Sequence, residues 1–230
     1  MTKKLYLSDS YLDSCQAQVL DILETEQGQA VVLDQSCFYP QGGGQPSDTG
    51  LINATQVKTV RLAPDGTILH YLAASPDFEI GSTVNLEIDV DKRQMYCRLH
   101  TAGHLISHLV DQLNLGLNPY KGFHFPEGPY AAFYGSIEST PEFILELENK
   151  LNDLIAKDLK VKSYIATEQE IQDLNLSAPE GKQVRLVQIG DYQAMGCGGT
   201  HVSSLSEIGK LRIRKIKSKK GETKISYEIY

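Results

Sequence analysis

Long apolar runs, closely spaced cysteines and a leader-like N-terminus are all missing from this 230-residue chain. No apolar stretch approaches the roughly 18 residues that a membrane span requires. Lys3 and Lys4 are not followed by a sustained apolar segment, so we expect no secretory signal. The four cysteines are scattered without disulfide-framework spacing: Cys15, Cys37, Cys97 and Cys197. These absences argue against a membrane protein or a disulfide-stapled secreted domain, and they favour the reducing cytoplasm.

Positive charge is also scarce, because 22 Lys and Arg residues face 29 Asp and Glu residues and leave a net charge of −7. This balance argues against a general-purpose nucleic-acid binder. Residues 210–220 are the exception, with seven basic residues among eleven. Their partial apolar alternation, with a slip near Lys215, predicts a strand with one solvated face. The same basic side chains could form a strip that meets phosphates, and the two interpretations are compatible.

The first part of the chain is rich in strand signals. Residues 30–33 form a short apolar run, and residues 55–62 and 67–72 flank a Pro64-Asp65-Gly66 turn that predicts a hairpin. Residues 83–90 alternate with period two, as expected of a strand with one buried face. Several short strands separated by turns predict a small β-barrel-like domain over residues 1–90.

The second part, residues 91–230, mixes helices with strands. Leu99, Leu105 and Leu109 recur at helical intervals within a predicted helix over 91–115, which Gly116 and Pro119 close. A second helix is predicted over 141–159, with Thr140 as its N-cap, and a short one over 168–174. Strands are predicted over 130–137, 161–166 and 184–189, and a final hairpin over 211–216 and 224–229. We therefore expect an α+β domain.

Two residue pairs in this part have metal-ligand spacing. His100 and His104 are four residues apart within the predicted helix, so their side chains share one face. Cys197 and His201 have the same spacing in a glycine-rich run, Cys-Gly-Gly-Thr-His. Imidazole and thiolate are ligands that zinc prefers. Two such pairs predict a Zn²⁺ site that is assembled only in the folded chain.

The sequence leaves the role of this metal open. Zinc peptidases place a glutamate after the first histidine, whereas here Thr101 follows His100, so chemistry of that kind lacks its base. Four simultaneous ligands would close a tetrahedral site and make it structural; catalysis requires a loose ligand or a fifth position. His108, one turn further on, could be a ligand too, but a third histidine at this spacing is more often a packed or capping neighbour. We attach no function to Gly103, because the histidine spacing would also tolerate a larger residue there.

A second unusual segment, residues 38–50, reads Phe-Tyr-Pro-Gln-Gly-Gly-Gly-Gln-Pro-Ser-Asp-Thr-Gly. Three glycines followed by Gln45 offer exposed backbone and an amide that both donates and accepts hydrogen bonds. The Lys-Ser/Thr ending of a phosphate-binding loop is absent. A flexible loop between strands is the default interpretation.

Together, the 38–50 segment, His-Thr-Ala-Gly-His-Leu and Cys-Gly-Gly-Thr-His-Val resemble the editing region of alanyl-tRNA synthetases. The resemblance is closer still to the stand-alone alanyl-tRNA editing proteins of the AlaX group, in their medium-length form. It spans roughly residues 38–202 with the motifs in the family's order.

This resemblance implies an α+β editing domain shared with threonyl-tRNA synthetases. It also implies a zinc-dependent hydrolase that deacylates mischarged tRNA(Ala), chiefly Ser-tRNA(Ala), with glycine as a second candidate. Zinc would be held by His100, His104, Cys197 and His201, and would orient the aminoacyl ester or activate water. Gln45 and Thr101 are then the candidates for contacting the serine hydroxyl or placing water.

Two other functions remain open from the residues alone. One is a non-catalytic RNA-binding module with a structural zinc, which a four-ligand set favours and the overall acidity disfavours. The other is a zinc hydrolase for small esters or aminoacyl compounds unrelated to tRNA.

Overall fold

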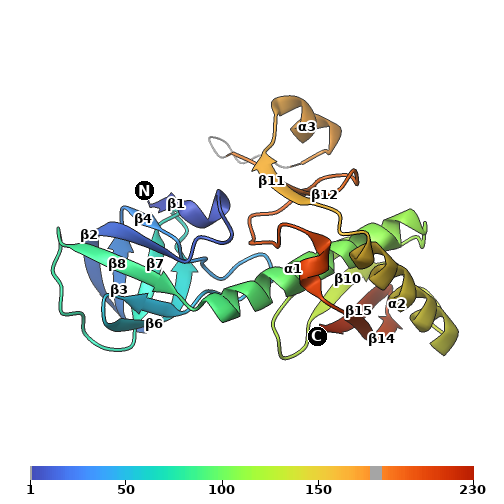
Figure 1. Cartoon of the computed structure of the whole chain (residues 1–230), viewed down its shortest axis with the longest axis horizontal. Helices are drawn as coiled ribbons and strands as arrows, with labels where there is room; N and C mark the ends of the chain where they lie inside the picture. The colour runs from blue at the N-terminus through green and yellow to red at the C-terminus, as the bar shows by residue number, and fades with distance from the viewer. Residues whose placement is uncertain (1, 177–182) are drawn as a thin grey trace. The chain divides into compact units, whose positions relative to one another are not determined.

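The computed structural model describes residues 2–176 and 183–230, which divide into two compact units, Met1–Tyr96 and Cys97–Tyr230 (Figure 1). The sequence predicted a boundary after residue 90, and the structure separates the units after Tyr96, within helix α1 (Val90–Gln112).

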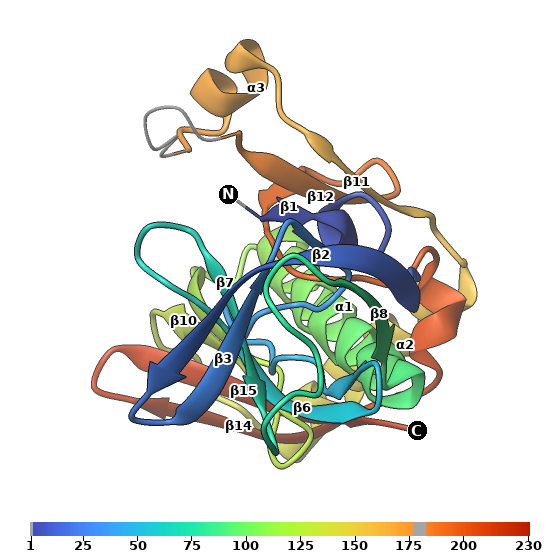
Figure 2. The ribbon, with the colours of Figure 1, turned by 90° about the vertical axis from the view of Figure 1, so that its left-hand side faces the viewer.

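The first unit is a closed barrel of six strands in the order β2-β3-β7-β6-β5-β8, with antiparallel neighbours throughout (Figure 2). The strands are β2 (Ser14–Thr25), β3 (Gly28–Leu33), β5 (Gly50–Ile52), β6 (Thr55–Leu62), β7 (Ile68–Leu72) and β8 (Thr83–Ile88). A parallel pair, β1 (Lys3–Lys4) and β4 (Gln35–Ser36), and the 3₁₀ turn η1 (Leu5–Leu7) complete this unit. The predicted β-barrel is confirmed.

Side-chain alternation explains the barrel core. In β8, Val84, Leu86 and Ile88 are buried and the residues between them are exposed, as the period of two predicted. The β6–β7 hairpin turns at Pro64-Asp65-Gly66, where the Asp65 carboxylate accepts the Thr67 N–H and Gly66 has a φ of +87°.

The longest barrel strand, β2, was not predicted. Ala17 and Val19 are buried between exposed neighbours, so a signal of period two was present in its first half. The pairing register with β3 then shifts between Val19 and Asp21, which breaks the alternation. Because of this bulge, the alternation of buried and exposed residues does not continue along the strand, and periodicity alone does not predict it.

The second unit contains a four-stranded antiparallel sheet in the order β14-β15-β10-β9 and a three-stranded sheet in the order β11-β12-β13. Their strands are β9 (Asn118–Phe123), β10 (Tyr130–Tyr134), β11 (Val161–Ile165), β12 (Arg185–Ile189), β13 (Met195–Gly196), β14 (Leu211–Lys219) and β15 (Glu222–Ile229). Helix α2 (Pro141–Ala156) packs on β14; the remaining elements are α3 (Glu168–Asp173) and the 3₁₀ turn η2 (Leu205–Ile208). The α+β expectation is confirmed.

Local chemistry sets the ends of several elements. Thr140 caps α2 by accepting the Phe143 N–H at 3.2 Å, as predicted. Helix α1 ends at Gln112, earlier than predicted, and Asn114 two residues later has a φ of +48°, a left-handed conformation typical of helix ends. The last hairpin turns on Lys220-Gly221, both with positive φ, so its strands are longer than predicted.

Strand β9 was not predicted; Pro119, which was expected only to close the preceding helical segment, lies within it together with Gly122, and both residue types are uncommon inside strands. It is an edge strand that pairs only with β10, a position where proline is tolerated. No helix in residues 2–176 or 183–230 is both long and apolar enough to span a membrane.

Candidate metal centre

Helix α1 brings His100, Thr101 and His104 together on its buried side. His100 is 2% exposed and Thr101 is fully buried. The spacing of four residues places the two imidazoles above one another, with ring centroids 5.1 Å apart.

The second ligand pair lies on the loop that follows β13. The Arg185 guanidinium holds this loop by donating to the carbonyl oxygens of Cys197 and Gly199 at 2.9 and 2.8 Å. The Cys97 thiol lies 3.1 Å from the Thr200 hydroxyl and ties the loop to α1. The sequence did not predict that Arg185 and Cys97 hold this loop.

The loop and the helix converge on one point. One potential ligand atom from each of His100, His104, Cys197 and His201 lies within 4.8 Å of the other three. The Cys197 sulfur is 3.4 Å from Nε2 of His100 and 3.3 Å from Nε2 of His201. The structure thus brings together all four residues that were predicted to bind the metal, across 97 positions of sequence in the case of Cys197 and His100.

Electrostatics fit a cation at this point. Burial lowers the pKa of His104 to about 3 and places the pKa values of His100 and His201 well below the ordinary value, so the imidazoles are neutral. Burial raises the pKa of the Cys197 thiol, while the Gly199 N–H and Arg185 act in the opposite direction. Neutral imidazoles with free lone pairs are the form that binds metals.

Thr101 fixes the tautomer of one ligand. Its hydroxyl donates to the Cys97 carbonyl at 2.8 Å, so it must accept from Nδ1–H of His201, 3.0 Å away. Nε2 of His201 then carries the lone pair and faces the Cys197 sulfur. The Val202 N–H also donates to the threonine oxygen, at 3.3 Å. The hydroxyl is therefore fully engaged inside the protein.

His104 contributes a further sign of an incomplete site. Its Nδ1 is buried and has no hydrogen-bond partner among the residues that the structure describes. Buried polar atoms without partners are uncommon in folded proteins and call for an explanation such as an ion. The donor set, the tautomer and this nitrogen all fit a bound metal.

Comparison with known proteins agrees with the fold and the cluster. Residues 11–92 match the family model of class II (A) tRNA synthetases, and residues 184–224 match the second additional domain of threonyl and alanyl tRNA synthetases. The alanyl-tRNA editing protein AlaX-M of Pyrococcus horikoshii is 34% identical over 92% of this chain and 90% of its own length. The chain belongs to the AlaX-M family of alanyl-tRNA editing proteins.

Two further relatives define the extent of this match. AlaX-M of Saccharolobus solfataricus is 31% identical over 100% of this chain and 99% of its own length. An alanine–tRNA ligase of Halorubrum lacusprofundi is 34% identical over 93% of this chain, which corresponds to 24% of that ligase. The chain thus matches the AlaX-M proteins over nearly their whole length and the ligase over one part.

A histidine that was not predicted packs against the ligand cluster of this AlaX-M family member. The His124 ring stacks on His100 with centroids 4.5 Å apart. Its Nδ1 lies 2.7 Å from the Tyr227 hydroxyl, which donates to the Leu99 carbonyl at 2.8 Å, so Nδ1 carries the proton. Burial lowers the pKa of His124 to about 4. His124 is thus a neutral, oriented ring beside a ligand.

Two glycines make room for this ring. A Cβ on Gly103 would lie 2.2 Å from Cε1 of His124, and a Cβ on Gly122 would lie 2.2 Å from its Nε2. The spacing of the two histidines permits a larger residue at position 103, as the sequence indicated, but the packing of His124 leaves no room for one.

His108 lies outside the ligand group. Its ring stacks on Tyr192 at 5.3 Å, and its Nε2 is buried without a partner within the described residues. It lines a hollow of about 450 Å³ together with Asp111, Met195 and Gly196, among others. The stacking of His108 on Tyr192 agrees with its interpretation as a packed neighbour.

Gln45 belongs to the first unit. It is fully buried, and its backbone pairs with Gly42 in both directions, at 2.8 and 3.2 Å. Asp48, also in this segment, accepts the Tyr39 N–H and forms a buried ion pair with Arg93, which also donates to the Cys37 carbonyl at 2.7 Å. The segment lies between strands β4 and β5, as expected of a loop between strands, and the bond between Asp48 and Tyr39 connects its two ends.

Proposed function

We propose that this protein hydrolyses the ester that joins a wrong amino acid, chiefly serine, to tRNA(Ala), and that it acts in the cytoplasm. The convergence of His100, His104, Cys197 and His201 on one point carries this proposal. In an AlaX-M family member, a site of this kind is best explained as the deacylation centre.

The metal that we propose is Zn²⁺. Three imidazoles and one thiolate suit its borderline-soft character, and His100, His104, Cys197 and His201 would hold it. When bound, it would polarise the ester carbonyl or lower the pKa of a water molecule.

The protein's own side chains then hold the metal and orient its ligands. We assign Thr101 a positioning role, because its hydroxyl is occupied by Cys97, His201 and Val202 and would have to leave them to contact substrate. His124 restrains the His100 ring by stacking. Gln45 remains our candidate for contacting the serine hydroxyl or placing the attacking water.

Selectivity follows from hydrogen bonding. A pocket sized for alanine cannot strongly reject serine, which adds only a hydroxyl. A second site that hydrogen-bonds this hydroxyl can select serine, because alanine would leave its polar groups unpaired. Glycine is a second candidate substrate.

Release of serine from Ser-tRNA(Ala), compared with release of alanine from Ala-tRNA(Ala) under the same conditions, tests the proposal. We expect rapid release of serine and at least a 100-fold slower release of alanine, since polar selection of this kind reaches about 10⁴-fold or more. Equal rates, or no release from either, would end the proposal.

A structural metal in a non-catalytic RNA-binding module is the second candidate, favoured by a set of four donors, the number that closed structural zinc sites use. The two candidates differ in the behaviour of Gln45→Ala. A deacylase should lose turnover while keeping its fold and RNA affinity, whereas a binding module has no turnover to lose.

A further inference from the structure

One face of the β14-β15-β10-β9 sheet is strongly basic. On β14 and β15 the apolar residues Ile213, Ile216 and Ile225 are buried, and the residues between them point to the opposite face. The pairing register places Lys217 opposite Lys224, and Lys224 opposite Ala132 of β10. The register shift between Ile213 and Lys215 is the slip that the sequence predicted.

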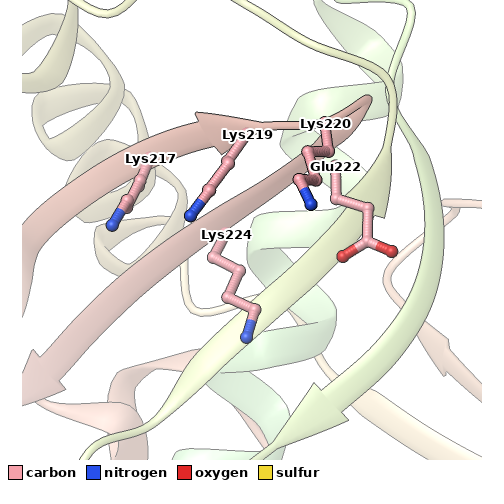
Figure 3. Close-up of a pocket in the computed structure, with 5 residues that line it drawn as sticks. All are labelled: Lys217, Lys219, Lys220, Glu222 and Lys224. Atoms are coloured by element: carbon pink, nitrogen blue, oxygen red, sulfur yellow. The ribbon is translucent and has the colours of Figure 1, made fainter.

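Lysines on this face line a hollow of about 400 Å³ at the end of the β14–β15 hairpin (Figure 3). Its lining consists of Lys217, Lys219, Lys220, Glu222 and Lys224. Four ammonium groups and one carboxylate thus surround the hollow. The Glu222 carboxylate accepts a hydrogen bond from the Tyr120 hydroxyl at 2.9 Å. In the described part of the chain, Lys217, Lys219 and Lys224 form no ion pair within 4.0 Å.

This arrangement costs stability in the free protein. Two like charges directly opposite each other on neighbouring strands repel, as Lys217 and Lys224 do here. The chain as a whole carries a net charge of −7, so positive charge is concentrated on this face rather than spread evenly. A local positive surface on an acidic protein attracts a polyanion and orients it.

Aromatic rings accompany the lysines. The Lys224 ammonium lies 4.7 Å from the centre of the Tyr130 ring, a cation–π contact. Tyr120 and Tyr134 stack with centroids 4.2 Å apart, and Tyr134 is 55% exposed. Exposed rings beside ammonium groups are typical of surfaces that bind nucleic acid, because phosphates contact the cations and bases or sugars contact the rings.

We propose that this face, defined by Lys217, Lys219, Lys224, Tyr130 and Tyr134, binds the phosphodiester backbone of tRNA. The identity of the RNA rests on the proposed function, while the surface itself rests on the charges and rings described above. The lysines contact phosphates and release counterions, and Tyr134 offers its exposed ring to a sugar or base.

Binding of uncharged tRNA(Ala) to the full-length chain, measured by fluorescence anisotropy at several salt concentrations, tests this surface. The triple variant Lys217→Ala, Lys219→Ala, Lys224→Ala should bind at least tenfold more weakly at about 0.1 M salt. The slope of log affinity against log salt should fall by about 2 to 3, since each lost phosphate contact removes about 0.7 to 0.9.

A matched control removes three exposed lysines elsewhere in the second unit: Lys157, Lys160 and Lys162. This control changes the net charge by the same amount as the test variant. If the position of the lysines determines binding, its affinity for tRNA(Ala) should stay within about twofold of that of the parent. The Lys-to-Arg triple variant should retain binding, because guanidinium also contacts phosphate. Tyr134→Ala should weaken binding without changing the salt slope.

The results separate this proposal from the proposed function. Unchanged affinity and salt slope in the lysine triple variant would overturn the surface, even when the parent hydrolyses Ser-tRNA(Ala). An equal loss in both triple variants would also overturn it, because only net charge would matter. Loss confined to Lys217, Lys219 and Lys224 supports the surface whatever the parent hydrolyses. Parent protein that binds an acidic polypeptide more tightly than tRNA would assign the face to a protein partner instead.

Discussion

At the scale of single residues, the metal centre depends on which nitrogen of each imidazole carries a proton. For His201 the protonated nitrogen is set by Thr101, because the hydroxyl hydrogen of Thr101 is donated to the Cys97 carbonyl. The histidine therefore donates from Nδ1 and keeps its Nε2 lone pair for the metal. Groups that orient a metal ligand in this way contribute to affinity without touching the metal.

Thr101→Val should weaken metal binding by about 10- to 100-fold, because it keeps the shape of the side chain and removes the acceptor for His201. Competition with a chelator of known affinity measures the loss. Thr101→Ser keeps the hydroxyl and should stay within a few-fold of the parent. Equal metal affinity in the valine and serine variants would contradict the positioning role.

At the scale of elements, the sequence predicted some features of the site and not others, for identifiable reasons. His100 and His104 were predictable because helical periodicity alone places residues four apart on one face. His124 was not, because it follows an edge strand interrupted by Pro119 and Gly122, and its contact with His100 exists only in the tertiary fold. The glycine two residues before it was the available signal, since Gly122 leaves space for this ring.

The longer-range features divide in the same way. The barrel could be expected from alternating strands and turn residues, whereas the bulge in β2 concealed the longest strand. The buried contacts of the 38–50 segment could not be predicted, because they include the pair of Asp48 and Arg93, 45 positions apart.

Gly103→Ala tests the packing of α1 against His124. Alanine normally stabilises a helix by roughly 0.5–1 kcal/mol relative to glycine. Here we expect a loss of about 1–3 kcal/mol in the free energy of unfolding, because the new Cβ would overlap the His124 ring. Urea unfolding measures this difference.

Gly128→Ala is the control for this substitution, since among the described residues its Cβ would meet just the Arg214 guanidinium, at 3.6 Å. It should change the free energy of unfolding by less than about 0.5 kcal/mol. A Gly103→Ala variant as stable as the parent would show that the ring can move aside, and the account of His124 would fail.

At the scale of the whole molecule, all six histidines share one electrostatic property. Burial lowers the pKa of each of them below the ordinary value of 6.5: His70, His100, His104, His108, His124 and His201. The folded protein therefore keeps these rings neutral under conditions in which the unfolded chain protonates them.

Between pH 6.5 and about 4, the unfolded chain thus binds more protons, so the metal-free protein should lose stability as the pH falls. Each histidine contributes up to about 1.4 kcal/mol per pH unit in this window. Urea unfolding from pH 7.5 to 4.5 measures the slope. His70→Gln, in the first unit, should lower this slope by the amount that corresponds to about one proton taken up on unfolding. Stability that stays constant from pH 7 to pH 5 would contradict neutral burial of these rings.

The central claim is that His100, His104, Cys197 and His201 hold a zinc ion on which deacylation depends. Its most direct test is the initial rate of serine release from Ser-tRNA(Ala) by the full-length protein, measured as isolated, after chelation, and after return of Zn²⁺. We expect the rate to fall at least 100-fold on chelation and to recover with zinc, and His104→Ala to stay inactive at any zinc concentration. Full activity in the metal-free protein, or in His104→Ala, would contradict the account.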